Sequence, residues 1–219
     1  MTTNGISTVN KECETEKDLG VTFDNKLSFD SHIQSCINKS NSMIGVIKRT
    51  FQFLDRDTFI KLYKALVRPH LEYGNVIWYP QFKRQSVAIE RVQRRATKLL
   101  PECRGMTYEE RLNYLNLHSL KGRRVRGDLI EAFKLYNGLV DGDWNLFFTN
   151  VKYTNTRGSE GKIYVKHCNL NLRKNTFSSR ILKLWNNLGS QLKNAQSTNS
   201  FKNQLDCESK FVKLFRDFD

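Results

Sequence analysis

Apolar residues recur every three or four positions over most of the chain, which is the spacing of one buried face of an α-helix. In the first such stretch Ile33, Ile37, Ile44 and Ile47 keep this spacing. Pro69 should stop or kink the second helix. We therefore expect a mainly α fold, with helices at residues 32–50, 57–68, 86–100, 107–117, 120–138, 178–192 and 198–215.

Two other parts of the chain depart from this spacing. Residues 19–23 are rich in β-formers and run into Asp24-Asn25, which predicts a short hairpin near the amino end. Residues 141–161 shift to Asp, Gly, Asn and Thr, which predicts a boundary or an exposed loop, and the loose alternation over residues 163–172 suits one or two short strands. We therefore expect a hairpin, a helical domain and a smaller α+β carboxy-terminal tail at residues 1–30, 31–140 and 141–219.

The charge of the chain is strongly positive. Lys and Arg number 36 against 22 Asp and Glu, which gives a formal net charge of +14. Because cations placed on phosphates release condensed counterions, this excess favours a polyanionic partner. Nucleic acid is the leading candidate and an anionic membrane surface the second. A charge that only keeps the protein soluble is the third interpretation.

The positive charge is concentrated between residues 81 and 126, where twelve basic and four acidic residues leave a net +8. A helix that buries Ile89, Val92 and Ala96 must turn its arginines outward, and a guanidinium suits bidentate contact with phosphate. The alternative is a solvated face with local pairs such as Arg124 with Asp128. We assign phosphate contact to Lys83, Arg84, Arg91, Arg94, Arg95, Lys98, Arg123, Arg124 and Arg126.

The other residue types offer no independent active site. Five cysteines are scattered and the four histidines stand alone, so zinc spacing is absent and we expect no metal in this chain. Cys36 paired with a distant histidine is a weaker interpretation than a buried apolar thiol. Trp78 could stack on a base, but core burial is the favoured role. Without a leader or membrane-spanning pattern, we expect an intracellular protein, nuclear or cytoplasmic, with no membrane partner.

Five strings of residues, taken in order, resemble one protein family. They are Lys17–Asp24 (KDLGVTFD), Leu62–Tyr73 (LYKALVRPHLEY), Glu90–Lys98 (ERVQRRATK), Tyr108–Leu112 (YEERL) and Arg123–Ile130 (RRVRGDLI). A weaker echo follows at residues 177–180 and 184–188. The order of the strings makes the match specific. From residue 17 to about 137, the chain resembles the reverse transcriptases of non-LTR retrotransposons, of the jockey-like LINE type.

The resemblance implies a place for this chain within an RNA-directed DNA polymerase. Leu19, Gly20 and Val21 would lie at the edge of the palm, in a hairpin resembling a primer grip, and the helices beyond would form the thumb. The family holds two Mg²⁺ ions with a Tyr-x-Asp-Asp-type motif and an upstream Asp, whereas this chain has no two adjacent Asp residues. We therefore expect a C-terminal fragment that is inactive alone, with no cofactor of its own and Mg²⁺ only in the missing palm.

The resemblance also implies the partners, which are an RNA–DNA template–primer duplex and the missing N-terminal polymerase domains. Contact should go through phosphates and A-like shape more than through bases. Because an isolated hairpin is marginal in water, residues 17–23 should not form a stable strand pair without the palm. Two alternatives stay open: a catalytically dead, stand-alone nucleic-acid-binding module, and a helical protein-interaction domain whose arginines pair with acidic partners.

Overall fold

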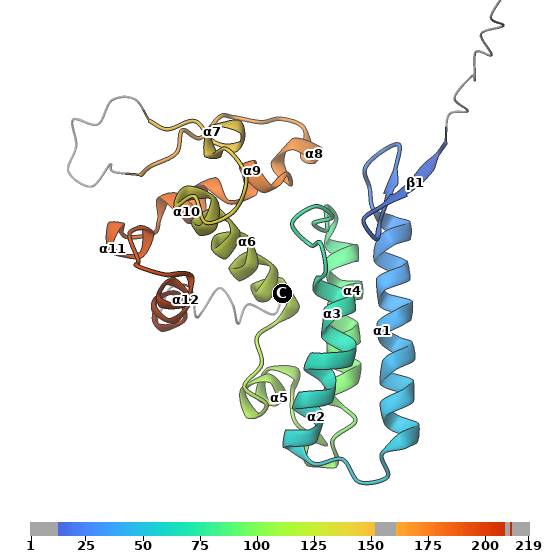
Figure 1. Cartoon of the computed structure of the whole chain (residues 1–219). Helices are drawn as coiled ribbons and strands as arrows, with labels where there is room; N and C mark the ends of the chain where they lie inside the picture. The colour runs from blue at the N-terminus through green and yellow to red at the C-terminus, as the bar shows by residue number, and fades with distance from the viewer. Residues whose placement is uncertain (1–12, 152–160, 209–210, 212–219) are drawn as a thin grey trace, which may run out of the picture.

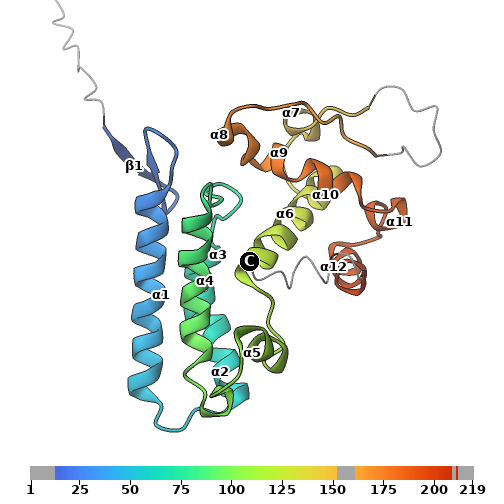
Figure 2. The same ribbon diagram turned by 180° about the vertical axis from the view of Figure 1, so that it is seen from behind.

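The computed structural model describes residues 13–151, 161–208 and 211. A short hairpin is followed by helices throughout most of the described chain (Figure 1). One group of elements contains the hairpin and three long helical segments that lie side by side, and a second group packs around the end of a later helix, as both views show (Figure 2). The predicted mainly α fold with a short amino-terminal hairpin is confirmed.

The hairpin consists of β1 (Thr15–Asp18) and β2 (Val21–Asp24), paired antiparallel with Asp18 opposite Val21. Leu19 and Gly20 form its two-residue loop with φ of 44° and 83°, the positive values of a type I′ turn. Residues 17–23 were not expected to form a stable strand pair without the palm, yet the two strands are paired here. That expectation ignored the anchoring of the hairpin on the helices, because Val21 is buried in their core.

Three helical segments follow the hairpin. The first is α1 (Asp30–Thr50), whose isoleucines face the core as their spacing predicts. The second is continuous from α2 (Arg56–Leu62) through the π-helical turn η1 (Tyr63–Val67) to α3 (Arg68–Glu72). The third is α4 (Lys83–Thr97), which packs against α1.

Pro69 does not stop the second segment, which continues to Glu72. A proline inside a helix lacks the N–H of the i→i−4 bond, and its ring clashes with the carbonyl four residues earlier. Here Arg68 N–H bonds to Tyr63 O, five residues back, so the helix is already widened into a π turn where the proline enters. The apolar face of this segment can therefore stay buried on both sides of Pro69.

Capping side chains fix the start of the next helices. The short η2 (Pro101–Cys103) precedes α5 (Tyr108–Tyr114), where Thr107 and Glu110 form a reciprocal capping box. Ser119 caps α6 (Leu120–Tyr136) through the N–H of Gly122. Both caps stand where the apolar spacing predicts a new helix.

The carboxy-terminal part is built of short helices rather than the two long ones predicted. Residues 178–192 divide among three short helices, and in residues 163–172, where strands were expected, only the isolated bridge of Ile163 with Asn150 occurs. Residues 208–215 of the last predicted helix lie largely outside the described residues. The elements are α7 (Trp144–Phe147), α8 (Asn171–Lys174), α9 (Phe177–Arg180), α10 (Leu182–Asn186), α11 (Ser190–Lys193) and α12 (Thr198–Cys207).

The buried apolar side chains form two clusters that divide within α6. The first extends from Val21 to Leu120, so the hairpin shares a core with the long helices, and the second begins at Leu129. Trp78 is fully buried in the first cluster, as its predicted core role requires. In the described residues, no helix combines the length and the apolar character needed to cross a membrane.

Candidate nucleic-acid interface

The outer face of α4 carries only positive charge. Its exposed charged side chains are Lys83, Arg84, Arg91, Arg94 and Arg95, and the exposed Lys98 follows at the carboxyl end. The inner face buries Ile89, Val92 and Ala96, so the amphipathic spacing orients the helix as predicted.

Glu90, the one acidic residue of α4, is buried and turned away from this face. Its carboxylate accepts hydrogen bonds from the backbone N–H groups of Leu120 (3.0 Å) and Lys121 (3.3 Å) at the start of α6, and from the hydroxyl of Tyr108. Burial, together with the charge of Glu90, raises the pKa of Tyr108, so the hydroxyl stays protonated and donates a hydrogen bond to the carboxylate. Glu90 therefore anchors the start of α6.

Helix α1 adds a row of polar side chains beside the arginines. Arg84 donates to Asp30 at 2.9 Å, and Arg95 donates to Asn41 at 3.5 Å. In each pair the two residues are 54 positions apart in the sequence, so α1 and α4 run in the same direction. Between these two contacts α1 exposes Gln34 and Asn38. We call the combined surface the α1–α4 basic face, and define it by Arg84, Arg91, Arg95, Lys98, Gln34, Asn38 and Asn41.

The α1–α4 basic face is long enough for a strand of nucleic acid. Arg84 and Lys98 are 14 residues apart, which is roughly 21 Å at the rise of an α-helix. A duplex strand places a phosphate about every 3.4 Å along its axis, so the face spans about six phosphates. Among the described residues, Arg91 and Lys98 have no carboxylate partner. The amide row of α1 was missed from the sequence, although the four-residue spacing of Gln34 and Asn38 already marks one exposed helix face.

The three predicted arginines of α6 do not join this face. Arg124 is only 2% exposed, which corrects its assignment as an outward phosphate contact. Arg123 forms a bidentate ion pair with Glu72 on α3, and Arg126 forms another with Asp206 on α12, with both distances 2.7 Å. Asp128 forms its ion pair with Arg180 and not with Arg124, the local partner considered from the sequence. These arginines connect elements of the protein to each other.

Two cations of the predicted set lie beside the face. The Arg94 guanidinium stacks on the ring of Tyr108 at 4.3 Å, which holds it towards α5. Lys83 lies at the first residue of α4 and lines a separate pocket. We therefore leave both out of the α1–α4 basic face.

The hairpin tip was predicted to resemble a primer grip, and its three residues have different surroundings. Leu19 is 80% exposed, Gly20 approaches the Tyr73 ring, and Val21 is buried. The hydroxyl of Tyr73, the residue that follows α3, donates to Leu19 O at 2.9 Å and so ties the tip to the end of that helix. Of these three residues, only Leu19 presents a side chain to solvent. Val21 belongs to the core, so its side chain cannot take part in the predicted primer-grip-like contact.

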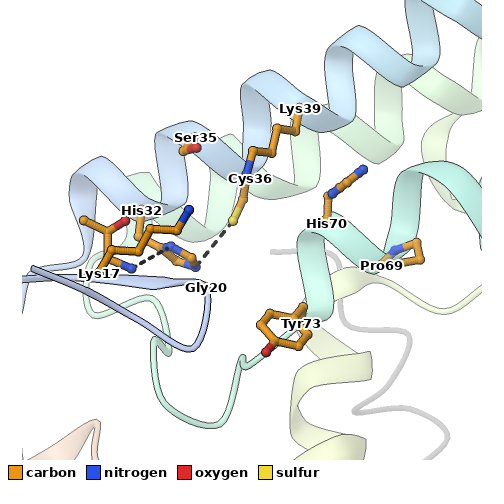
Figure 3. Close-up of a pocket in the computed structure, with 10 residues that line it drawn as sticks. Lys17, Gly20, His32, Ser35, Cys36, Lys39, Pro69, His70 and Tyr73 are labelled. Atoms are coloured by element: carbon orange, nitrogen blue, oxygen red, sulfur yellow. Dashed lines mark hydrogen bonds between the residues drawn. The ribbon is translucent and has the colours of Figure 1, made fainter.

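A pocket of about 300 Å³ between the hairpin, α1 and α3 contains the histidine–cysteine pair His32 and Cys36 (Figure 3). His32 Nδ1 accepts the N–H of Thr22 at 3.2 Å, which places the ring proton on Nε2, 3.4 Å from Cys36 Sγ. Burial raises the pKa of the Cys36 thiol. The imidazole has no free lone pair for the thiol proton, so the pair holds the hairpin and is not an activated nucleophile.

This pair gives the fold a pH dependence. Burial, with the charges of Lys39 and Lys17, lowers the pKa of His32 below its usual 6.5. Between 6.5 and that lower value the unfolded chain binds a proton that the folded chain does not, so the free energy of unfolding falls as pH falls. Between about pH 6.5 and pH 5, we expect the free energy of unfolding to fall less in His32→Asn than in the wild type, because asparagine does not titrate. The Oδ1 atom of the asparagine can still accept the Thr22 N–H. Urea unfolding across this range measures the fall, and equal declines in both proteins would contradict the assignment.

In the described part of the chain, no three His, Cys, Asp or Glu side chains gather as a metal site would require. The five cysteines are all free thiols.

Comparisons with known proteins add one distant relative. Uncharacterized protein B0403.1 of Caenorhabditis elegans is 25% identical to this chain over 131 residues. The matched region covers 58% of this chain and spans 64% of the relative's length. No family model and no solved structure matches the chain. The name of this relative states no activity.

Proposed function

We propose that this chain binds double-helical nucleic acid through the phosphate backbone, with the α1–α4 basic face as the contact surface. One observation carries the proposal: every exposed charged side chain of α4 is cationic, while its carboxylate, Glu90, is buried and fully used inside. The solvent-exposed face of a helix without a binding role usually mixes acidic and basic side chains.

The composition of the face suits backbone contact rather than base reading. Arginines bind phosphate oxygens with two parallel hydrogen bonds, and the amides of Gln34, Asn38 and Asn41 offer donors and acceptors to sugars and phosphates. Cations on a rigid helix fix the position of a duplex without recognising its sequence. We therefore expect RNA–DNA hybrids and unrelated DNA duplexes to bind with similar affinity.

Within that function we propose that the chain is the C-terminal thumb and post-thumb region of a non-LTR retrotransposon reverse transcriptase. One of the family-like strings that support this, Glu90–Lys98, covers the carboxyl half of α4 and so contributes to the face. Another, Leu62–Tyr73, covers η1 and α3, which pack against α1. In such an enzyme this region would hold the template–primer duplex while carboxylates elsewhere bind the Mg²⁺ ions and carry out the chemistry.

A binding series tests the proposal directly. Fluorescence anisotropy would be measured with an RNA–DNA hybrid, two unrelated DNA duplexes and poly-L-glutamate as a protein-like polyanion. We expect all three nucleic acids to bind, with log affinity falling linearly with log salt. The proposal would be abandoned if poly-L-glutamate bound as tightly as the duplexes, because that result indicates a site for acidic protein segments.

A further inference from the structure

A second pocket lies at the amino end of α4, where the connection from α3 enters the helix. It has a volume of about 380 Å³, and its lining includes Tyr79, Phe82, Lys83, Ser86 and Lys121. Lysines are the charged residues of this lining, and no Asp or Glu among the described residues belongs to it. Lys83 comes from α4 and Lys121 from α6, so the two ammonium groups belong to different elements.

The start of α4 has no acidic cap, and the nearby carboxylate of Asp30 on α1 already accepts hydrogen bonds from the side chains of Gln85 (2.8 Å) and Arg84 (2.9 Å). The first N–H groups of a helix have no acceptor within it, and together they carry roughly half a positive charge. Phe82 at the cap position has no oxygen to offer, and the first turn contains no acidic residue. Gln85 Oε1 accepts the N–H groups of Gln81 (2.8 Å) and Phe82 (3.1 Å), which precede the helix. The Gln85 carbonyl oxygen therefore binds N–H groups of the connection and none of the N–H groups inside the first helical turn.

A buried guanidinium stands directly behind this pocket. Arg124, 2% exposed, donates from Nη2 to Ser86 Oγ at 3.0 Å, and Ser86 lines the pocket. The Nε and Nη1 atoms of Arg124 are buried and have no hydrogen-bond partner among the described residues. An arginine keeps its charge even when buried, and burying such a charge without a partner is costly.

The nearby carboxylates are already occupied. Asp128 forms a bidentate pair with Arg180 at 2.7 and 2.8 Å, and Glu90 accepts backbone N–H groups of α6. The positive charge of Arg124 is therefore left without a carboxylate of its own, one hydrogen bond behind the pocket wall. A negatively charged ligand in the pocket would supply the missing compensation.

The aromatic residues indicate what accompanies the negative charge. Phe82 is 44% exposed at the pocket, with the Arg84 guanidinium over its ring at 5.0 Å. Exposed rings next to cations stack well on nucleobases. A nucleotide combines a phosphate with such a base, whereas an acidic side chain does not.

We infer that the pocket at the amino end of α4 binds the phosphate group of a nucleotide, held by Lys83, Lys121 and the Ser86 hydroxyl, with Arg124 as the buried counter-charge. The source of that phosphate, a free nucleotide or a nucleic-acid strand, rests on the proposed nucleic-acid-binding function. The pocket itself is separate from the α1–α4 basic face and can be tested apart from it.

The test titrates inorganic phosphate, AMP and the RNA–DNA hybrid into the full chain and follows backbone amide signals of residues 83–86 by NMR. We expect saturable shifts with phosphate and AMP. Arg124→Met should weaken both by at least tenfold while the protein stays folded, because replacing an uncompensated buried charge by an apolar side chain of similar size is often neutral or stabilising. Lys121→Gln, a change at the pocket rim, should weaken them as well and serves as the second variant.

The outcomes separate this inference from the proposed function. Tighter binding of AMP than of phosphate supports base stacking on Phe82, and equal binding supports a site for the phosphate group alone. Unchanged AMP and phosphate affinity in folded Arg124→Met and in Lys121→Gln, or no saturable shift in the wild type, overturns the inference. Hybrid binding that persists in Arg124→Met leaves the α1–α4 basic face in place, whereas AMP binding without hybrid binding removes the proposed function and keeps the pocket.

Discussion

Replacing Asp128 by alanine is expected to lower the free energy of unfolding by about 3–5 kcal/mol, because it leaves a buried arginine without its counter-charge. The side chains of Asp128 and Arg180 are 3% and 10% exposed and form two hydrogen bonds of 2.7 and 2.8 Å. Arg180 also donates to the carbonyls of Val76 and Asn175 and stacks on Tyr79. The loss would therefore loosen the contact of α6 with α9 and with the connection before α4.

Urea unfolding followed by circular dichroism measures this loss. Glu131→Ala is the matched control in the same helix, because Glu131 pairs with Lys134 at 3.1 Å and both side chains are one-third exposed. An exposed pair contributes less than about 1 kcal/mol. The double variant Asp128→Leu with Arg180→Met should recover much of the stability, since it removes both buried charges. Equal costs for Asp128→Ala and Glu131→Ala would show that the buried pair is not the main connection.

The apolar spacing was enough to predict the long helices, because burial of one face dominates their energetics. It failed where short helices alternate with turns. The stretch 178–192 buries Ile181, Trp185, Leu188 and Leu192, which mimics one amphipathic helix, yet it breaks into three pieces. Contacts made after the turns, such as Asn186 Oδ1 with the N–H of Ile163 at 2.8 Å, are tertiary and leave no periodic trace in the sequence.

Tertiary contacts also limit what the sequence predicts about the basic residues. The arginines of α4 could be oriented from the sequence because their apolar neighbours fix which face is buried. Arg123 and Arg126 could not, because their carboxylate partners Glu72 and Asp206 lie 51 and 80 residues away. Arg124 is the extreme case, since no local rule predicts an arginine in an interior.

The structure also changes which arginines should be replaced to test nucleic-acid contact. Arg94 stacks on Tyr108, so its loss would mix packing with charge. Arg91, Arg95 and Lys98 are exposed and lie on one face of α4 and its carboxyl end. Their replacement should leave the free energy of unfolding within about 0.5 kcal/mol of the wild type, because exposed charges contribute little.

The triple variant Arg91→Ala, Arg95→Ala, Lys98→Ala is expected to flatten the salt dependence of duplex binding. Each phosphate neutralised contributes roughly −0.9 to the slope of log affinity against log salt, so three lost contacts remove up to about 2.7 from its magnitude. Fluorescence anisotropy on an RNA–DNA hybrid across a salt series measures the slope, with circular dichroism as the folding control. The charge-preserving variant Arg91→Lys, Arg95→Lys should keep most of the slope, because a lysine still neutralises a phosphate.

The matched control for net charge is Arg173→Ala, Lys174→Ala, Lys183→Ala, which removes three exposed cations from α8 and α10. Both triple variants lower the net charge by three, so long-range attraction weakens alike, and only contact with phosphates distinguishes them. We expect the control to shift the affinity slightly and to leave the slope almost unchanged. If a folded α4 variant kept the wild-type slope, or if the control flattened it equally, the α1–α4 basic face would be a hydrated surface without a phosphate-binding role.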